Sequence, residues 1–198
     1  MDGKSKIKYI FILTASVFLY VVCLIVAAFL SKNFFTRELW GKINQSYIQI
    51  YNIEITVTRI MHIIMGLPLY IYGLSLVYKT TIQNHTAQDK NTRKPIKLLT
   101  KGVYSIRRHP MYTGFICLQV GLWFSLYSAV GYIVGCLIVF IVSINSIIEE
   151  KNELEKIFPM DYVTYKREVP RRIYTIKLLC YLLVIGVMAI VSIITMGS

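Results

Sequence analysis

The stretch Gly102-Val-Tyr-Ser-Ile-Arg-Arg-His-Pro-Met-Tyr-Thr-Gly114 stands where a basic, polar segment turns into a long apolar one. Pro110 suits the first turn of a helix, because the amide hydrogen that it lacks would have no partner there. The residue before it, His109, then falls at the helix cap. Arg107, Arg108 and His109 therefore gather at the positive end of a helix that enters a membrane. Free amides, the helix dipole and guanidinium groups at such an end favour an anion.

The pair Glu149-Glu150 belongs with this stretch because of its distance along the chain. Met111–Ser128 and Val130–Ile148 are uncharged, mainly apolar runs of eighteen and nineteen residues. At a rise of about 1.5 Å per residue, each run nearly covers the ~30 Å core of a bilayer. A helical hairpin of two such spans returns the chain to its starting level, so we expect the two glutamates beside His109. A cationic cap that faces two carboxylates suits a zwitterionic ligand.

Two patterns around these residues resemble the isoprenylcysteine carboxyl methyltransferase family of membrane enzymes. The first pattern is Leu98-Leu99-Thr-Lys-Gly102-x-Tyr104, followed by Arg108-His109-Pro110-x-Tyr112-x-Gly114. The second is Glu149-Glu150-x-x-x-Leu154-x-x-x-Phe158-x-x-x-Tyr162-x-x-Tyr165-x-x-x-Val169-Pro170-Arg171. Both occur in the family's order and at its spacing. We therefore expect residues 95–172 to be the methyltransferase core of a single membrane domain, residues 1–198.

The resemblance implies methyl transfer from S-adenosylmethionine to a lipid-borne acceptor, foremost the carboxylate of an isoprenylcysteine-like substrate that enters from the bilayer. It assigns the cofactor contacts to Leu98, Leu99, Tyr104, His109, Pro110, Met111, Tyr112 and Glu150. Substrate contacts are expected from Arg107, Tyr165 and Arg171. A carboxylate acceptor needs positioning and the exclusion of water more than acid–base chemistry, so no catalytic base is assigned. Glu149 and Arg171 are expected to help position the reactants.

The sequence departs from the family pattern at one place. The family usually has an arginine four residues before the glutamate that corresponds to Glu150, and this chain has Ser146 there. Arg171 or Arg107 would then have to replace that arginine. Alternatively, the acceptor is a phospholipid amine, which requires a base such as Glu149. Two further alternatives are a sterol-type membrane reductase that uses NADPH and a membrane adaptor without catalytic activity.

Composition places the chain among helical membrane proteins. The 198 residues are 56% hydrophobic, above the usual soluble range, and the apolar residues form long runs rather than stripes. We expect an all-α integral membrane fold with about five transmembrane helices. The third and fourth spans would form the catalytic hairpin, and a cytoplasmic helix would precede the last span. The four cysteines and three histidines show no metal-ligand spacing, so no metal is expected.

The expected spans alternate with polar segments, and the polar segments carry the charge. The spans are Tyr9–Leu30, Ile55–Tyr78, Met111–Ser128, Val130–Ile148 and Ile176–Met196. The region Ser31–Glu54 is expected to be a re-entrant or surface segment outside the cell. Lys79–Lys101 is expected to be a cytoplasmic loop, and Glu149–Phe158 the cytoplasmic helix. With Lys177, at the start of the last span, counted with the segment before it, 18 of the 22 basic residues lie on one side and 3 on the other, and Arg59 lies within a span.

The positive-inside rule makes the more basic side cytoplasmic. The N-terminus and the active site are then cytoplasmic, in the cell membrane of a prokaryote or the endoplasmic reticulum of a eukaryote. The net charge of +12 is explained by this distribution together with attraction to anionic lipids. Nucleic acid is therefore not expected as a partner.

Arg59 and His62 lie one turn apart in the second expected span. An ionisable group within a span is a candidate for function. In the structural alternative, Arg59 reaches the membrane interface while His62 forms a hydrogen bond to a neighbouring helix. We favour this alternative, because both residues lie toward the face opposite the motifs. Gly114 and Gly121 are likewise expected to serve helix packing, and Gly66 with Pro68 to kink the second span.

Overall fold

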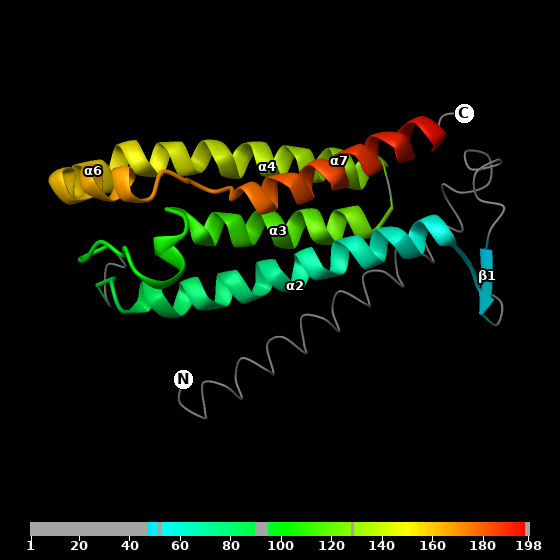
Figure 1. The fold of residues 1–198 in the computed structure, drawn as a ribbon, viewed down its shortest axis with the longest axis horizontal. Helices are drawn as coiled ribbons and strands as arrows, with labels where there is room; N and C mark the ends of the chain where they lie inside the picture. Colours follow the sequence, from blue (N-terminus) through cyan, green and yellow to red (C-terminus); the bar gives the residue numbers. More distant parts are fainter. Residues whose placement is uncertain (1–46, 51–52, 90–94, 128, 197–198) are drawn as a thin grey trace, which may run out of the picture.

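The computed structural model describes residues 47–50, 53–89, 95–127 and 129–196. The first expected span, Tyr9–Leu30, and most of the segment Ser31–Glu54 lie outside the described residues. The described part of the chain is mostly helical. Its long helices run side by side along the longest dimension of the molecule (Figure 1).

Three helices are long and apolar enough to cross a membrane, which confirms the class of helical membrane protein. They are α2 (Val57–His85), α4 (Ala129–Glu149) and α7 (Ile176–Met196). The helix between the first two, α3 (Pro110–Ser125), has 16 residues and covers only about 24 Å at the usual rise. It begins with Pro110 at its first position and His109 at its cap, as predicted. The number of five spans stays a prediction.

Helix α2 continues beyond the expected membrane span. We predicted a loop from Lys79 onward, and this was wrong for its first seven residues, since α2 ends at His85. The hydroxyl of Thr80 donates to the carbonyl of Leu76 at 2.7 Å, so the polar side chain is satisfied within the helix. A change from apolar to polar residues marks the edge of a membrane, whereas a helix ends only where the backbone is interrupted.

A short hairpin of two antiparallel strands precedes α2. Strand β1 (Tyr47–Ile50) pairs with β2 (Ile53–Thr56), with Tyr47 opposite Thr56. No strand was expected in this segment. The alternating isoleucine residues in both segments favour strands. The hairpin lies at the opposite end of the molecule from α6 (Figure 1).

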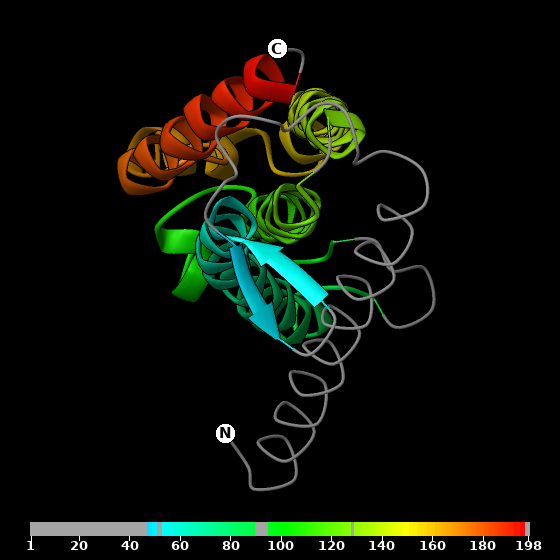
Figure 2. The ribbon, with the colours of Figure 1, turned by 90° about the vertical axis from the view of Figure 1, so that its right-hand side faces the viewer.

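Helix α3 lies at the centre of the bundle, between α2 on one side and α4 with α7 on the other (Figure 2). The contact between α2 and α3 depends on glycines. A Cβ atom on Gly73 would come within 2.6 Å of the carbonyl oxygen of Gly114, and one on Gly121 within 2.7 Å of that of Gly66. The packing role expected for Gly114 and Gly121 is thus confirmed, because any larger residue would push the two helices apart.

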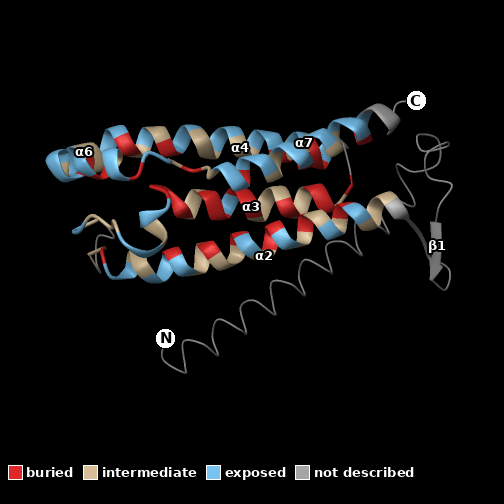
Figure 3. Cartoon of the chain, viewed as in Figure 1, coloured by how far each residue is buried: buried red, intermediate tan, exposed pale blue. Residues whose placement is uncertain are grey.

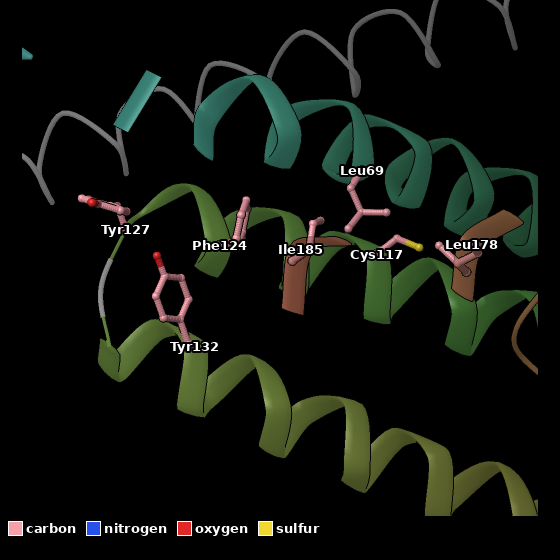
Figure 4. Close-up of a cluster of buried hydrophobic side chains, with 7 residues drawn as sticks. All are labelled: Leu69, Cys117, Phe124, Tyr127, Tyr132, Leu178 and Ile185. Carbon is pink, nitrogen blue, oxygen red and sulfur yellow. The ribbon is translucent and has the colours of Figure 1, made fainter. Parts of the chain in front are cut away.

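Buried residues concentrate on α3 and on the surfaces that face it, whereas the outer faces of α4 and α7 are largely exposed (Figure 3). Seven buried side chains form a core cluster (Figure 4), six from the four long helices and one, Tyr127, from the turn after α3: Leu69, Cys117, Phe124, Tyr127, Tyr132, Leu178 and Ile185. The exposed faces carry large apolar residues, among them Leu137, Phe140, Leu183 and Val187. Such faces suit contact with lipid rather than water.

The chain after α4 folds back onto the start of α3. The expected helix over Glu149–Phe158 is interrupted by a π-helical turn, η2 (Glu150–Leu154), before the short α5 (Glu155–Ile157). Helix α6 (Pro159–Glu168) follows. Residues 169–175 then run without regular structure from α6 to the start of α7 (Figure 1). This connecting segment closes the candidate site.

Candidate functional site

Residues 171–173 lie directly against the start of α3. The backbone amides of Arg108 and His109 donate to the carbonyls of Arg171 and Arg172, at 3.0 and 2.9 Å. The hydroxyl of Thr113, one turn into α3, donates to the carbonyl of Ile173 at 2.8 Å. The amides of Arg108 and His109 are therefore not free to bind an anion. They join the two predicted motifs through the backbone.

Glu150 is the centre of the site. Its residue is only 1% exposed, and three cationic groups surround its carboxylate. Arg108 Nε lies 2.9 Å and His109 Nε2 3.1 Å from one oxygen, and Arg172 Nη2 lies 3.1 Å from the other. A buried carboxylate is stable only when it is paired and hydrogen-bonded in this way. The expected juxtaposition of residues 109 and 150 is present, while their predicted roles in binding a ligand stay predictions.

Arg108 holds the connecting segment against this carboxylate. In addition to the bond with Glu150, its Nη1 donates to the carbonyls of Val169 and Pro170, at 2.8 and 3.0 Å. One guanidinium group thus joins the start of α3, the π-helical turn and the end of α6. Arg108 acts here as a structural clamp, because its planar donors are directed at several fixed acceptors at once.

His109 lies between the two glutamates. Its Nδ1 is 3.2 Å from Glu149 and its Nε2 3.1 Å from Glu150, so both nitrogens face carboxylates. A histidine can donate from both nitrogens only when it is protonated. Burial lowers the pKa of His109, but the hydrogen bonds and charges of Glu149 and Glu150 outweigh this and raise it above the ordinary value. The imidazolium separates two carboxylates that would otherwise repel each other.

Buried tyrosine residues form an aromatic layer next to the ion cluster. Tyr162 and Tyr165 on α6 pack edge to face, with ring centroids 6.0 Å apart, and both are buried. The hydroxyl of Tyr165 donates to the carbonyl of Tyr104 at 2.7 Å. Tyr104 in turn donates to Asn84 on α2 at 2.5 Å, and burial raises its pKa to about 12. These tyrosines remain neutral and join α2 and α6 to the site.

An open groove of about 500 Å³ lies beside this aromatic layer, between residues 96–100 and α6. Leu98 and Tyr165 contribute apolar and aromatic surface to it, and Asp161 and Glu168 contribute carboxylates. Leu98 was predicted to contact the cofactor, and the groove gives it a place to do so. Leu99, predicted for the same role, is half-buried and does not line the groove.

The other predicted residues occupy different parts of the site. Pro110 is buried, whereas Met111 and Tyr112 are half-buried at the start of α3. The sulfur of Met111 accepts a hydrogen bond from Asn84 at 3.8 Å, and the ring of Tyr112 stacks on His109 with centroids 5.4 Å apart. All three residues adjoin the ion cluster.

The arginines differ from the prediction in an informative way. The chain has two Arg-Arg pairs near the site, and in each pair the second residue contacts Glu150. Arg172, which was not among the predicted site residues, is the partner of the carboxylate. The side chain of Arg171 is exposed, and its predicted contact with the substrate stays a prediction. Arg107 points away from Glu150, toward Tyr72 on α2. The pairs themselves were visible in the sequence, but the direction of each side chain was not.

Metal-binding groups are absent from the part of the chain that the structure describes. No three histidine, cysteine, aspartate or glutamate side chains there lie close enough to hold an ion. Cys117, Cys136 and Cys180 are free thiols, with Cys117 in the core.

Comparisons with known proteins agree with the resemblance noted in the sequence. The family model described as phospholipid methyltransferase matches residues 61–161. A curated relative, protein-S-isoprenylcysteine O-methyltransferase B of Arabidopsis thaliana, is 36% identical over 74 residues, which are 37% of this chain and 38% of the relative. The match thus spans well under half the length of that relative. No solved structure matches the chain.

Proposed function

Because this chain belongs to the phospholipid methyltransferase family, we propose that it is a membrane enzyme that transfers a methyl group from S-adenosylmethionine to a lipid-borne acceptor. One observation carries the proposal. The carboxylate of Glu150 is buried among Arg108, His109 and Arg172, and Glu149 lies 3.2 Å from the other side of His109. Fixed charges of both signs at the end of an apolar bundle are suited to a zwitterion presented to a lipid.

The residues fit the amino-acid part of S-adenosylmethionine. Arg172 has a buried Nε without a hydrogen-bond partner among the described residues, although its side chain as a whole is 38% exposed. The side chain of Glu149 is 34% exposed. A ligand carboxylate can therefore bind at Arg172 and a ligand ammonium at Glu149, while Glu150 keeps both ends of the cluster in place.

The groove beside the aromatic layer fits the nucleoside part. Leu98 and Tyr165 supply apolar and aromatic surface for a base, and the carboxylates of Asp161 and Glu168 are acceptors for hydroxyl groups. The cofactor contacts that we propose are Leu98, Leu99, Tyr104, His109, Pro110, Met111, Tyr112 and Glu150, together with Arg172.

S-adenosylmethionine supplies an electrophilic methyl group when it is bound. The protein has to keep water away and hold the acceptor oxygen in line with that group. Both nitrogens of His109 face carboxylates, so the imidazolium orients the cluster and does not accept a proton. A carboxylate acceptor needs no base, and this favours O-methylation of an isoprenylcysteine-like lipid, the activity in the name of the Arabidopsis relative.

Methylation of a phospholipid amine is the second candidate, and the description of the family supports it. An amine must lose a proton, and the half-exposed Glu149 is the available carboxylate. Membership of a methyltransferase family argues against the sterol-type reductase and the adaptor without activity. The apolar outer faces of α4 and α7 suit an acceptor that arrives through the bilayer. On the distribution of basic residues we place the N-terminus and the site in the cytoplasm.

Titration calorimetry of the purified protein with S-adenosylmethionine and, separately, with NADPH tests the proposal. We expect binding of S-adenosylmethionine alone, followed by transfer of labelled methyl groups to a prenylcysteine and less to total lipid extract. Glu150→Gln should abolish binding, whereas the matched change Glu153→Gln, at an exposed site in η2, should not. Binding of NADPH without S-adenosylmethionine would contradict the proposed function.

A further inference from the structure

Arg107 is a buried cation that the ion cluster around Glu150 does not use. We infer that Arg107 forms a second anion site, in which it holds the negatively charged oxygen group of the lipid acceptor. This assignment rests on the proposed function for the identity of the acceptor. The binding of an anion by Arg107 is tested separately below.

The guanidinium group of Arg107 is only partly satisfied. The residue is 4% exposed, and its Nη2 donates to the hydroxyl oxygen of Tyr72 on α2 at 2.8 Å. Its Nε and Nη1 are buried and have no hydrogen-bond partner among the described residues. Its neighbour Arg108, equally buried, directs the corresponding two nitrogens at a carboxylate and two carbonyls. Two adjacent arginines thus differ in that one is neutralised and the other is not.

An arrangement of this kind calls for an anion. Arginine does not lose its proton in proteins, so burial cannot be relieved by neutralisation of the side chain. A buried charge without a partner is unfavourable, and a bound oxyanion would remove that cost. In the described part of the chain the ion pairs of arginine involve Arg108 and Arg172, and none involves Arg107.

Tyr72 provides a second hydrogen-bond donor, and it lies at the surface past which a ligand reaches Arg107. Its oxygen accepts from Arg107, so its own hydroxyl hydrogen can be directed at the same anion. The guanidinium carbon lies 5.9 Å from the centroid of the Tyr72 ring, and this residue is 41% exposed on the surface of α2. Because α2 is a candidate membrane span, a ligand that reaches Arg107 past Tyr72 comes from the side of the lipid.

Arg107 and Arg108 point in different directions, so the anions proposed to bind near each of them are two separate groups. Arg108 points toward η2 and the end of α6, where we place the amino-acid part of the methyl donor. Arg107 points toward α2. The ligand of Arg107 is therefore a separate group, a single oxyanion at the head of an apolar chain. A prenylcysteine carboxylate and the phosphodiester of a phospholipid share this chemistry.

The location also explains how the chain manages without the usual arginine at position 146. Ser146 is buried, and its hydroxyl donates to the carbonyl of Ser143 within α4 at 2.7 Å. It offers no charge to a substrate. Of the residues predicted to contact the substrate, Arg171 is exposed and the hydroxyl of Tyr165 already binds Tyr104. Arg107 is the one that is both buried and left with unused donors.

The decisive experiment compares anionic and neutral ligands on the full-length protein in detergent micelles. The probes are an N-acetyl-S-prenylcysteine and its carboxamide, which differ in charge but hardly in shape. The wild-type protein should bind the acid roughly ten- to a hundredfold more tightly than the amide. In Arg107→Gln this preference should disappear, while the affinity for S-adenosylmethionine stays unchanged. Arg167→Gln, at an exposed position in α6, is the matched control and should keep the preference.

A second pair of ligands identifies the source of the anion. If the wild-type protein prefers a short-chain phospholipid to the matching diacylglycerol, and Arg107→Gln loses that preference instead, the anion is the phosphodiester. Arg107→Lys should retain part of the preference, and Tyr72→Phe, which removes only one hydroxyl, should weaken it severalfold without disturbing the fold. An anion preference that survives in Arg107→Gln, or its absence from the wild-type protein with both pairs, overturns the inference.

The outcome remains separable from that of the proposed function. If the wild-type protein binds no S-adenosylmethionine and methylates no acceptor, the methyltransferase proposal is contradicted. Loss of the acid preference in Arg107→Gln would still establish the anion site in that case.

Discussion

The two ends of the bundle each contain a buried histidine whose two ring nitrogens are both engaged, yet the two sites differ completely in charge. His62, on α2, contacts the carbonyl of Thr58 at 2.8 Å and the hydroxyl of Ser192 on α7 at 3.2 Å. Its ring lies 4.4 Å from that of Phe124. His109 instead lies between two carboxylates. The contacts of His62 are with aromatic and uncharged groups, and those of His109 are with charged groups.

The difference shows how the same side chain serves structure at one place and binding at another. A neutral imidazole donates from one nitrogen and accepts at the other, which matches a carbonyl and a hydroxyl. His62 is thus fully satisfied and ties α2 to α7, as the structural alternative expected. The partners of His109 carry full charges, and Glu149 and Arg172 beside them are partly exposed. Charges that face an opening are available to a ligand, whereas a satisfied neutral pair is not.

The largest effect is expected from Glu150→Gln. It leaves Arg108, His109 and Arg172 close together without the charge that balances them. Removal of one partner from a buried ion pair typically costs about 3–5 kcal/mol. We expect a large drop in the thermal midpoint in detergent and loss of S-adenosylmethionine binding. The exposed change Glu153→Gln should alter neither, and a Glu150→Gln protein with ordinary stability would show that the cluster is not what holds this end together.

The next largest effect is expected at Arg172, and little effect is expected at its neighbour Arg171. Arg172→Gln removes a donor to Glu150 and the proposed contact to the ligand carboxylate, so binding of S-adenosylmethionine should weaken by about 1.5–3 kcal/mol. Arg171→Gln should change it little, because the side chain of Arg171 is exposed. Calorimetric titration of both variants checks this. The reverse order would mean that the connecting segment turns its side chains over when a ligand binds.

These arginines also mark the limit of what the sequence could predict. The start of α3 follows from local signals, since Pro110 and His109 determine a cap without help from the rest of the fold. The meeting of His109 with Glu150 follows from the lengths of two apolar runs. The choice of Arg172 over Arg171 depends on the path of an irregular segment, in which neighbouring side chains point in opposite directions. That path is determined by the clamp of Arg108 on Val169 and Pro170, a tertiary contact that no local pattern encodes.

A substitution of His62 should lower the stability of the protein without changing its affinity for the ligand. His62→Leu keeps the volume approximately but leaves the hydroxyl of Ser192 without its ring partner, at a cost of about 1–3 kcal/mol. The thermal midpoint should fall, while the affinity of the remaining folded protein for S-adenosylmethionine stays the same. Unfolding curves and titrations on the same preparation measure both. A selective loss of affinity in His62→Leu would show that the two ends are coupled through α2.

The smallest effect is a fall in stability with rising pH that is due to His109. The pKa of His109 is raised in the folded protein, so its protonated form stabilises the fold fully below the ordinary value of about 6.5. This contribution is lost as the pH rises through the raised pKa, because the neutral ring can no longer donate to both Glu149 and Glu150. Each unit of the raised pKa corresponds to about 1.4 kcal/mol. Thermal midpoints recorded from about pH 6 to 9 should therefore decline in the wild-type protein and in His62→Leu, and decline less in His109→Gln. An equal decline in all three proteins would mean that His109 is not held as a cation, and the contrast between the two ends would then lie in shape rather than in charge.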